Sequence, residues 1–161
     1  MDQPKRHYPG AQTVEDIRAN LAAVEARITA ACQRAGRARS EVILLPVSKT
    51  VEIERLKLSL AAGCTYLGEN KVQEARLKAE ALSAYPIRWS VIGHLQSNKA
   101  KYVARFAHEF QALDKLSTAE VLDRRLEHEG RSLDVFIQIN SSDEASKYGL
   151  HPDEALALRT L

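Results

Sequence analysis

Short groups of polar residues follow five segments whose apolar or alternating patterns are typical of β-strands. These groups are Ser48-Lys49-Thr50, Gly68-Glu69-Asn70, Gly93-His94, Asp114-Lys115 and Asn140-Ser141-Ser142. In parallel α/β folds, the reactive groups lie just past the carboxyl ends of the strands. We therefore expect Lys49, Asn70, His94 and Asn140 to lie around one concavity at that edge of a sheet.

Lys49 is the most informative of these residues, because it directly follows the continuous apolar run 42–47. Its side chain should leave from the mouth of a barrel rather than from the outer surface. Desolvation at such a place lowers the pKa of a lysine and yields an amine that can form a Schiff base with a carbonyl. The alternative is a solvated lysine that ends a strand, and the position along the strand alone favours this alternative.

The other strand-end residues each have two interpretations. Asn70 could hydrogen-bond a ring substituent of a ligand, or it could cap the helix that follows. His94 could be a metal ligand or an acid–base group, or a loop or structural histidine, which the pattern favours. No second His, Cys or carboxylate stands at metal-ligand spacing, so we expect no metal site. Gln138 and Asn140 alternate on one face of a strand, which indicates a polar-lined pocket.

The spacing of the expected strands indicates the fold. The strands cover residues 42–47, 66–67, 88–92, 110–113 and 133–139, so that their starts differ by 24, 22, 22 and 23 residues. The 42–47 run, being continuously apolar, is typical of a strand buried on both faces. Helical patterns separate the strands, and such repeats are typical of parallel strands with right-handed crossovers. The even spacing and the absence of a GxGxxG turn favour a (β/α)₈ barrel over an open doubly wound sheet.

The chain of 161 residues is short for that fold. Eight units of this spacing would end at roughly residue 225, within the range of such barrels. We therefore expect a flexible arm over residues 1–12 and one barrel domain over residues 13–161. That domain would supply the N-terminal helix and about five of the eight βα units, incomplete at its C-terminal end.

Local signals place the helix ends. Thr13 and Asp16 are spaced as an approximate capping box at the start of the first helix, and Ser117 and Glu120 as a second box. Gly130 is expected to end the helix that Ser117 opens, and Pro152 suits the first turn of a last helix.

Composition excludes several classes of protein. With 23 Lys+Arg and 21 Asp+Glu, the net charge of +2 gives no electrostatic footprint for nucleic acid. No apolar run approaches the ~20 residues that cross a bilayer, and the first residues lack the apolar segment of a signal peptide. The two cysteines, Cys32 and Cys64, are far apart and form no CxxC pair, which favours a reduced, cytoplasmic setting.

Four motifs taken together resemble one family, the pyridoxal 5′-phosphate (PLP) homeostasis proteins, also called proline synthetase co-transcribed homologues. They are Val47-Ser48-Lys49-Thr50; Gly68-Glu69-Asn70 with Val72-Gln73-Glu74; Trp89 with the segment 92–99; and the segment 140–144 with Lys147-Tyr148-Gly149. The resemblance implies a barrel like the N-terminal domain of alanine racemase. It also implies that Lys49 forms a Schiff base with PLP and that Asn70 lies near the cofactor. With His94 and Asn140 at neighbouring strand ends, these residues make the expected cofactor-binding set.

The resemblance further implies a cytoplasmic, usually monomeric PLP carrier without robust catalysis, which serves PLP-dependent client enzymes. We accordingly predict no catalytic residue. The family holds the phosphate with residues of its last strands, which would lie beyond position 161. Two alternatives stay open: a PLP-dependent enzyme of the alanine racemase or decarboxylase type, and a fragment that does not bind PLP. A dimer is a further possibility for a chain of this length.

Overall fold

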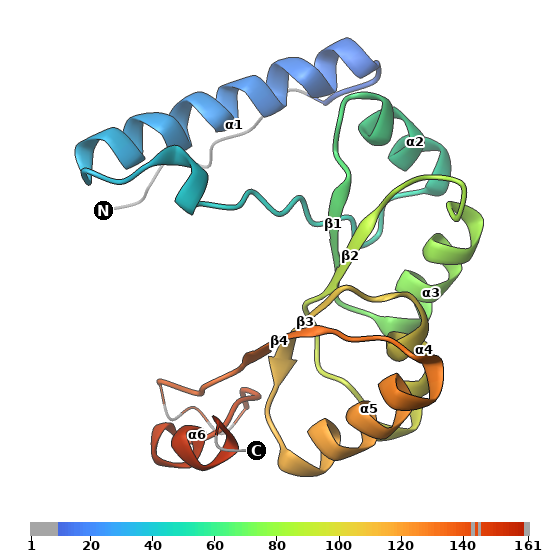
Figure 1. Cartoon of the computed structure of the whole chain (residues 1–161). Helices are drawn as coiled ribbons and strands as arrows, with labels where there is room; N and C mark the ends of the chain where they lie inside the picture. The colour runs from blue at the N-terminus through green and yellow to red at the C-terminus, as the bar shows by residue number, and fades with distance from the viewer. Residues whose placement is uncertain (1–9, 143, 145, 160–161) are drawn as a thin grey trace. The chain divides into compact units, whose positions relative to one another are not determined.

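The computed structural model describes residues 10–142, 144 and 146–159, which form two compact units (Figure 1). One unit comprises residues 1–45 and 51–64, and the other comprises residues 46–50 and 65–161. Most of the expected arm, residues 1–9, lies outside the described residues. No helix in the described ranges is both long and apolar enough to cross a membrane.

The described part of the first unit contains three helical segments: α1 (Val14–Arg34), η1 (Arg39–Glu41) and α2 (Ile53–Ala61). The predicted capping box at the start of α1 is confirmed. The Thr13 hydroxyl accepts a hydrogen bond from the Asp16 amide at 3.1 Å, and the Asp16 carboxylate accepts one from the Thr13 amide at 2.9 Å. Hydrogen bonds from the backbone amides of Gln12 and Thr13 lower the pKa of Asp16. The ionised carboxylate is therefore the form that caps the helix.

The second unit is a parallel sheet with helical crossovers, as the strand spacing predicts. Its strands are β1 (Tyr66–Glu69), β2 (Arg88–Val91), β3 (Glu109–Leu113) and β4 (Asp134–Ile137), paired in chain order. Its helices are α3 (Val72–Ala81), η2 (Ser97–Lys99), α4 (Ala100–Phe106), α5 (Leu116–Glu129) and α6 (Pro152–Arg159). Helices α3, α4 and α5 lie along the same side of the sheet (Figure 1).

The core of this unit lies between the sheet and its helices. Val91 of β2 and Phe110 of β3 are fully buried, and they belong to one apolar cluster with Val103, Ala104 and Leu122 of the helices. Small side chains on α4 let this helix approach the strands closely, so that burial holds the strand ends in fixed places. The loops that follow the strands lie outside this core and can carry polar residues.

The prediction of a buried strand over residues 42–47 is wrong. Only one parallel bridge forms there, from Val47 to Gly68, and Ile43 is 73% exposed. The Ser48 amide donates to the carbonyl oxygen of Gly68, and the Gly68 amide donates to that of Pro46, both at 2.9 Å. Because β1 begins only at Tyr66, its backbone can pair only with the last residues of the run. The run therefore enters the sheet just before Lys49.

The predicted capping box at Ser117 is also wrong. Helix α5 has Lys115 at its N-cap position and no capping side chain, and Thr118 is buried inside its first turn. The Ser-x-x-Glu spacing is local and also occurs within helices, where the backbone satisfies the amides itself. The expected end of the helix is confirmed, because Gly130 adopts a φ of +61° there.

Candidate functional site

The expected site residues follow neighbouring strands at one edge of the sheet. Asn70 comes directly after β1, Gly93 and His94 follow β2, and Asp114 comes directly after β3. Lys49 joins this edge through the bridge between Val47 and Gly68 of β1. The parallel register thus brings polar groups from segments far apart in the sequence to one edge of the sheet.

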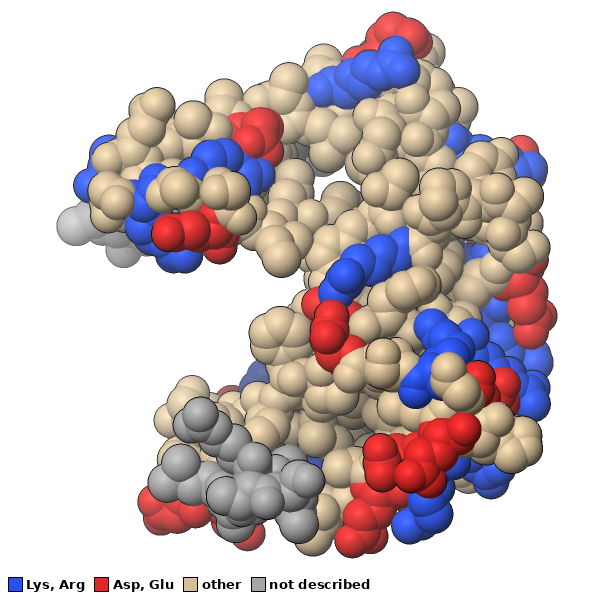
Figure 2. Space-filling model, in the orientation of Figure 1, with Lys and Arg blue, Asp and Glu red and all other residues tan. Residues whose placement is uncertain are grey.

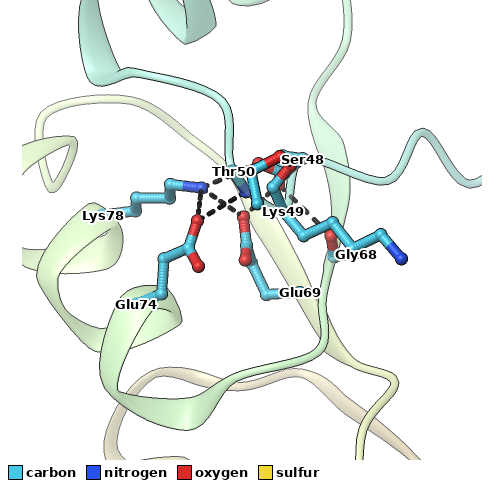
Figure 3. A network of polar contacts seen from close by, with 7 residues as sticks. All are labelled: Ser48, Lys49, Thr50, Gly68, Glu69, Glu74 and Lys78. Atoms are coloured by element: carbon cyan, nitrogen blue, oxygen red, sulfur yellow. Dashed lines mark hydrogen bonds and ion pairs between the residues drawn. The ribbon is translucent and has the colours of Figure 1, made fainter.

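A buried polar network lies beneath the backbone of Lys49 (Figure 3). At its centre is the Lys78 ammonium of α3, which donates at 2.7 Å to three oxygens: the Ser48 carbonyl, Glu69 Oε1 and Glu74 Oε1. The Ser48 hydroxyl donates to the same Glu69 oxygen at 2.6 Å. The side chain of Lys78 is only 6% exposed and that of Glu69 is completely buried. We call these four residues, Ser48, Glu69, Glu74 and Lys78, the Lys78 network.

The ionisation of the network favours the paired charges. Burial alone would lower the pKa of Lys78, but its hydrogen bonds to Glu69 and Glu74 outweigh this effect and raise it. The hydrogen bond from Lys78 lowers the pKa of Glu74, and the backbone amide of Thr50 adds to the effect. Around neutral pH, Lys78 is therefore an ammonium and Glu74 a carboxylate.

The Lys49 side chain points away from this network (Figure 3). Side chains alternate along an extended segment, so that Ser48 faces the network while Val47 and Lys49 face the other side. Val47 is 47% exposed and Lys49 is exposed as well. The expected desolvation of Lys49 is therefore not found, because this side of the segment is open to solvent.

Thr50 closes the turn in a strained conformation. Its φ of +61° lies in the left-handed region, which β-branched residues rarely adopt. The Thr50 amide donates to Glu74 Oε1 at 2.7 Å, and its hydroxyl donates to the Lys49 carbonyl oxygen at 2.6 Å. Such strain persists only where the surroundings fix the backbone. The turn that carries Lys49 is therefore held rigidly.

Asn70 and Gly93 bring the ends of β1 and β2 into contact. A β-carbon at Gly93 would lie only 2.0 Å from the Asn70 carbonyl oxygen, which no side chain could tolerate. The preceding residue, Ile92, donates its amide to the carbonyl oxygen of Glu69 at 2.9 Å. Because Gly93 has no side chain, Asn70 can lie against the start of the loop that carries His94.

His94 is held by two partners from later parts of the chain. Its Nδ1 lies 3.2 Å from the buried Asp114 carboxylate, and its ring stacks on that of Tyr148 at 4.1 Å and 11°. The two contacts fix both the position and the plane of the imidazole. No group of three or more metal-ligating side chains occurs in the part of the chain that the structure describes.

Asn140 organises the loop that carries Tyr148. Its side-chain amide donates to the Glu144 carbonyl oxygen at 3.0 Å, and its Oδ1 accepts from Ser142 at 3.3 Å. Gln138 likewise donates to the carbonyl oxygen of Tyr148 at 2.9 Å. Both amides are thus engaged with the backbone of their own loop, and the pocket lining expected from Gln138 and Asn140 stays a prediction.

The prediction that the four site residues surround one concavity remains a prediction. Two surface hollows, of about 370 Å³ between α3 and α4 and about 340 Å³ beside α5 and β4, include none of them. On the face drawn in Figure 2, basic and acidic side chains lie next to one another in both units. The charge distribution on this face offers no continuous basic surface.

Sequence reasoning did not name Lys78, and it named Glu74 and Tyr148 only within the family motifs, without a role. A signal for Lys78 was present, because it stands three residues after buried Ala75 and four before buried Leu82, on the apolar side of α3. Glu74 stands four residues before Lys78, the spacing of a helical ion pair. Tyr148 belongs to the motif Lys147-Tyr148-Gly149, but no spacing indicates its contact with His94, which forms only through the folded loop.

Comparisons with known proteins find several similar proteins. The sequence profile described as alanine racemase, N-terminal domain, matches residues 19–161. The pyridoxal phosphate homeostasis protein of Pasteurella multocida is 44% identical over 144 residues, which are 88% of this chain and 62% of the relative. That of Escherichia coli K12 is 40% identical over 140 residues, 85% of this chain and 60% of the relative. The chain thus spans about three fifths of the length of these curated relatives.

Solved structures are similar as well. PipY of Synechococcus elongatus, solved with PLP bound, is 30% identical, with a TM-score of 0.74 over 89% of this chain and 62% of PipY. A protein described as unknown, from Bifidobacterium adolescentis, is 32% identical, with a TM-score of 0.80 over 90% of this chain and 63% of that one. These likenesses confirm the α/β fold with a parallel, barrel-type sheet.

Proposed function

Because the chain belongs to the family defined by the alanine racemase N-terminal domain and resembles pyridoxal phosphate homeostasis proteins, we propose that it binds PLP through Lys49. The observation that carries this proposal is the placement of Lys49. Its amine is exposed at the carboxyl edge of a parallel sheet. The backbone on either side of it is hydrogen-bonded to Glu74 and Lys78 on the opposite side. No hydrogen bond or ion pair joins this amine to another of the described residues, so it is available to a ligand.

The chemistry of the surrounding residues fits PLP. When bound, PLP supplies an aldehyde that condenses with a primary amine with loss of one water molecule. Lys49 supplies such an amine, and Asn70 supplies an amide that can hydrogen-bond a substituent of the ring. His94 is the third member of the set, held in place by Asp114 and Tyr148. We assign Asn140 an indirect role, since it shapes the loop that brings Tyr148 to His94.

The physiological role that we propose is the storage and delivery of PLP in the cytoplasm, to PLP-dependent client enzymes, without robust catalysis. The names of the curated relatives support this role, since they describe homeostasis rather than a reaction. We also propose that the chain acts as a monomer, as the resemblance implies.

A second candidate function is favoured by one observation, the pair of His94 and Asp114. A histidine oriented by a buried carboxylate is an arrangement that can take up and return protons. An enzyme of the alanine racemase or decarboxylase type needs such a group beside its cofactor. Incubation of the PLP-loaded protein with single enantiomers of amino acids discriminates the two functions, since sustained racemisation or decarboxylation would support the enzyme.

The binding proposal is tested by locating the attached cofactor. We expect PLP treatment followed by borohydride reduction to add the mass of the reduced cofactor to the peptide containing Lys49. Lys49→Ala should abolish this adduct. The matched control Lys71→Ala changes an exposed lysine just before α3 and should leave the adduct in place. Labelling of the wild-type chain on peptides that exclude Lys49 would contradict the proposal.

A further inference from the structure

We propose that the Lys78 network is a positioning device for Lys49, a role that rests on the proposed binding of PLP at that residue. The network does not touch the Lys49 side chain, which points to the opposite side of the backbone (Figure 3). It acts instead on the main chain on either side of Lys49. It thereby sets the direction in which the amine leaves the sheet.

The contacts converge on the two peptide groups of Lys49. The peptide before it presents the Ser48 carbonyl oxygen, which accepts from the Lys78 ammonium at 2.7 Å. The peptide after it presents the Thr50 amide, which donates to Glu74 Oε1 at 2.7 Å. Lys78 and Glu74 are themselves joined at 2.7 Å. One ion pair therefore clamps both peptide groups, and Lys49 cannot change its φ and ψ without breaking a charge-assisted hydrogen bond.

The strain at Thr50 indicates that the clamp opposes a real tendency to move. A β-branched residue such as Thr50 is strained in the left-handed region, where its φ lies. A free turn would relax to a negative φ and swing the peptide that follows Lys49. The hydrogen bond from the Thr50 amide to Glu74 is the contact that opposes this relaxation.

The charges explain why Lys78 is needed. Two acidic side chains, Glu69 and Glu74, meet at one ammonium. Glu69 Oε1 accepts from both Ser48 and Lys78, whereas its Oε2 is buried without a hydrogen-bond partner among the described residues. Without the ammonium, Glu69 would be buried without its cationic partner, and Glu74 would lose the charge that it pairs with. The turn would then lose both anchors together.

A purely structural role would be to fasten α3 to β1. That role needs only the pair of Lys78 and Glu69, which joins the two elements directly. It does not need the contacts to Ser48 and Thr50, which lie outside both elements. Glu74 separates the two roles, because its removal frees the Thr50 amide and leaves Lys78 paired with Glu69.

The test compares Glu74→Ala with two matched variants on the same helix. Glu74→Gln keeps an oxygen that can accept from Thr50, and Glu80→Ala removes an exposed carboxylate outside the network. In the unliganded protein, hydrogen exchange should show the Thr50 amide losing protection at least tenfold in Glu74→Ala, by a rough estimate from the loss of its hydrogen bond. Protection in β2 and β3 should stay unchanged, as should Thr50 in both control variants.

The second readout is the rate at which PLP labels Lys49, followed by borohydride reduction and peptide mapping. We expect Glu74→Ala to slow this labelling by about tenfold, because misplacing a reacting group by a fraction of an ångström is costly. Glu80→Ala, labelled under the same conditions, serves as the reference. Lys78→Met should slow the labelling of Lys49 by more than Glu74→Ala does. If Lys78→Met fails to fold, Glu74→Ala alone still decides the test.

The outcomes separate the two proposals. If wild-type Lys49 is not labelled, the proposed function fails, while the exchange of the Thr50 amide still tests the clamp. If Thr50 loses protection in Glu74→Ala but Lys49 is labelled at the wild-type rate, the positioning role is overturned and PLP binding stands. Unchanged protection of Thr50 in Glu74→Ala would also overturn the clamp.

Discussion

Replacing Gly93 by alanine should disrupt the strand-end contact that fixes Asn70. The added β-carbon would lie 2.0 Å from the Asn70 carbonyl oxygen, 2.8 Å from its carbonyl carbon and 2.9 Å from its Cα. All three atoms belong to the backbone, so no rotamer change can relieve the clash. Bringing the closest contact to 3.0 Å requires a shift of about 1 Å between the two chain segments.

The cost of this shift can be estimated from overpacked cores, where an inserted methylene costs about 1–3 kcal/mol. We expect the upper end, about 3 kcal/mol, because the neighbouring hydrogen bond from Ile92 to Glu69 must lengthen as well. A loss of that size is a large part of the roughly 5–15 kcal/mol by which domains are stable. If Asn70 contacts the cofactor, the same displacement should also weaken the labelling of Lys49 by PLP.

Urea denaturation of Gly93→Ala beside two other glycine variants measures this effect. Gly10→Ala meets no atom within 4 Å and should change the free energy of unfolding by less than about 0.5 kcal/mol. Gly130→Ala also meets no atom, but its φ of +61° should cost about 1 kcal/mol. The reasoning is refuted if Gly93→Ala unfolds within 0.5 kcal/mol of the wild type, or loses less stability than Gly130→Ala.

Two further predictions concern the Lys78 network. The pKa of Glu74 is lowered from 4.5, so the stability that Glu74 contributes is present above pH 4.5 and lost as the pH falls through the pKa of the folded protein. Hydrogen exchange should therefore show the Thr50 amide losing protection only below pH 4.5. Glu74→Gln cannot titrate and should remove this pH dependence. Ser48→Ala should lower the free energy of unfolding by about 1.5–3 kcal/mol in urea denaturation, because it deletes a buried hydrogen bond to the Glu69 side chain. The exposed control Ser117→Ala should lower it by less than about 0.5 kcal/mol. Equal losses in the two variants would contradict the role of Ser48 in the network.

The order and direction of the strands could be predicted because they depend on repeated local patterns. Spacings of 22–24 residues leave room for one helix between strands, and that spacing permits parallel pairing of neighbours. The prediction of a strand over residues 42–47 was wrong, because an apolar sequence indicates burial but not whether a partner strand lies beside it. Ile43 is apolar and yet 73% exposed. Pairing is a property of the fold and is absent from the run itself.

The site was predicted only as far as topology determines it. A residue just after a parallel strand must lie at the carboxyl edge, which placed Lys49, Asn70 and His94. What those residues contact depends on distant segments. Asp114 could be named from the sequence but given no role, and its pairing with His94 needed the register of β2 and β3. The contact of His94 with Tyr148 needed the folded loop after β4.

The two-residue alternation of an extended segment reconciles an accessible amine with a rigid mounting. Ser48 faces the helices and is buried by Glu69 and Lys78, while Lys49, one residue later, faces the other way and is exposed. A lysine fixed by its own ion pair would be rigid but unavailable to a carbonyl. A lysine on a free loop would be available but would lose orientational freedom on binding. Fastening the peptide groups on either side of Lys49 avoids both costs, because all the ordering is done by residues that the ligand never needs to reach.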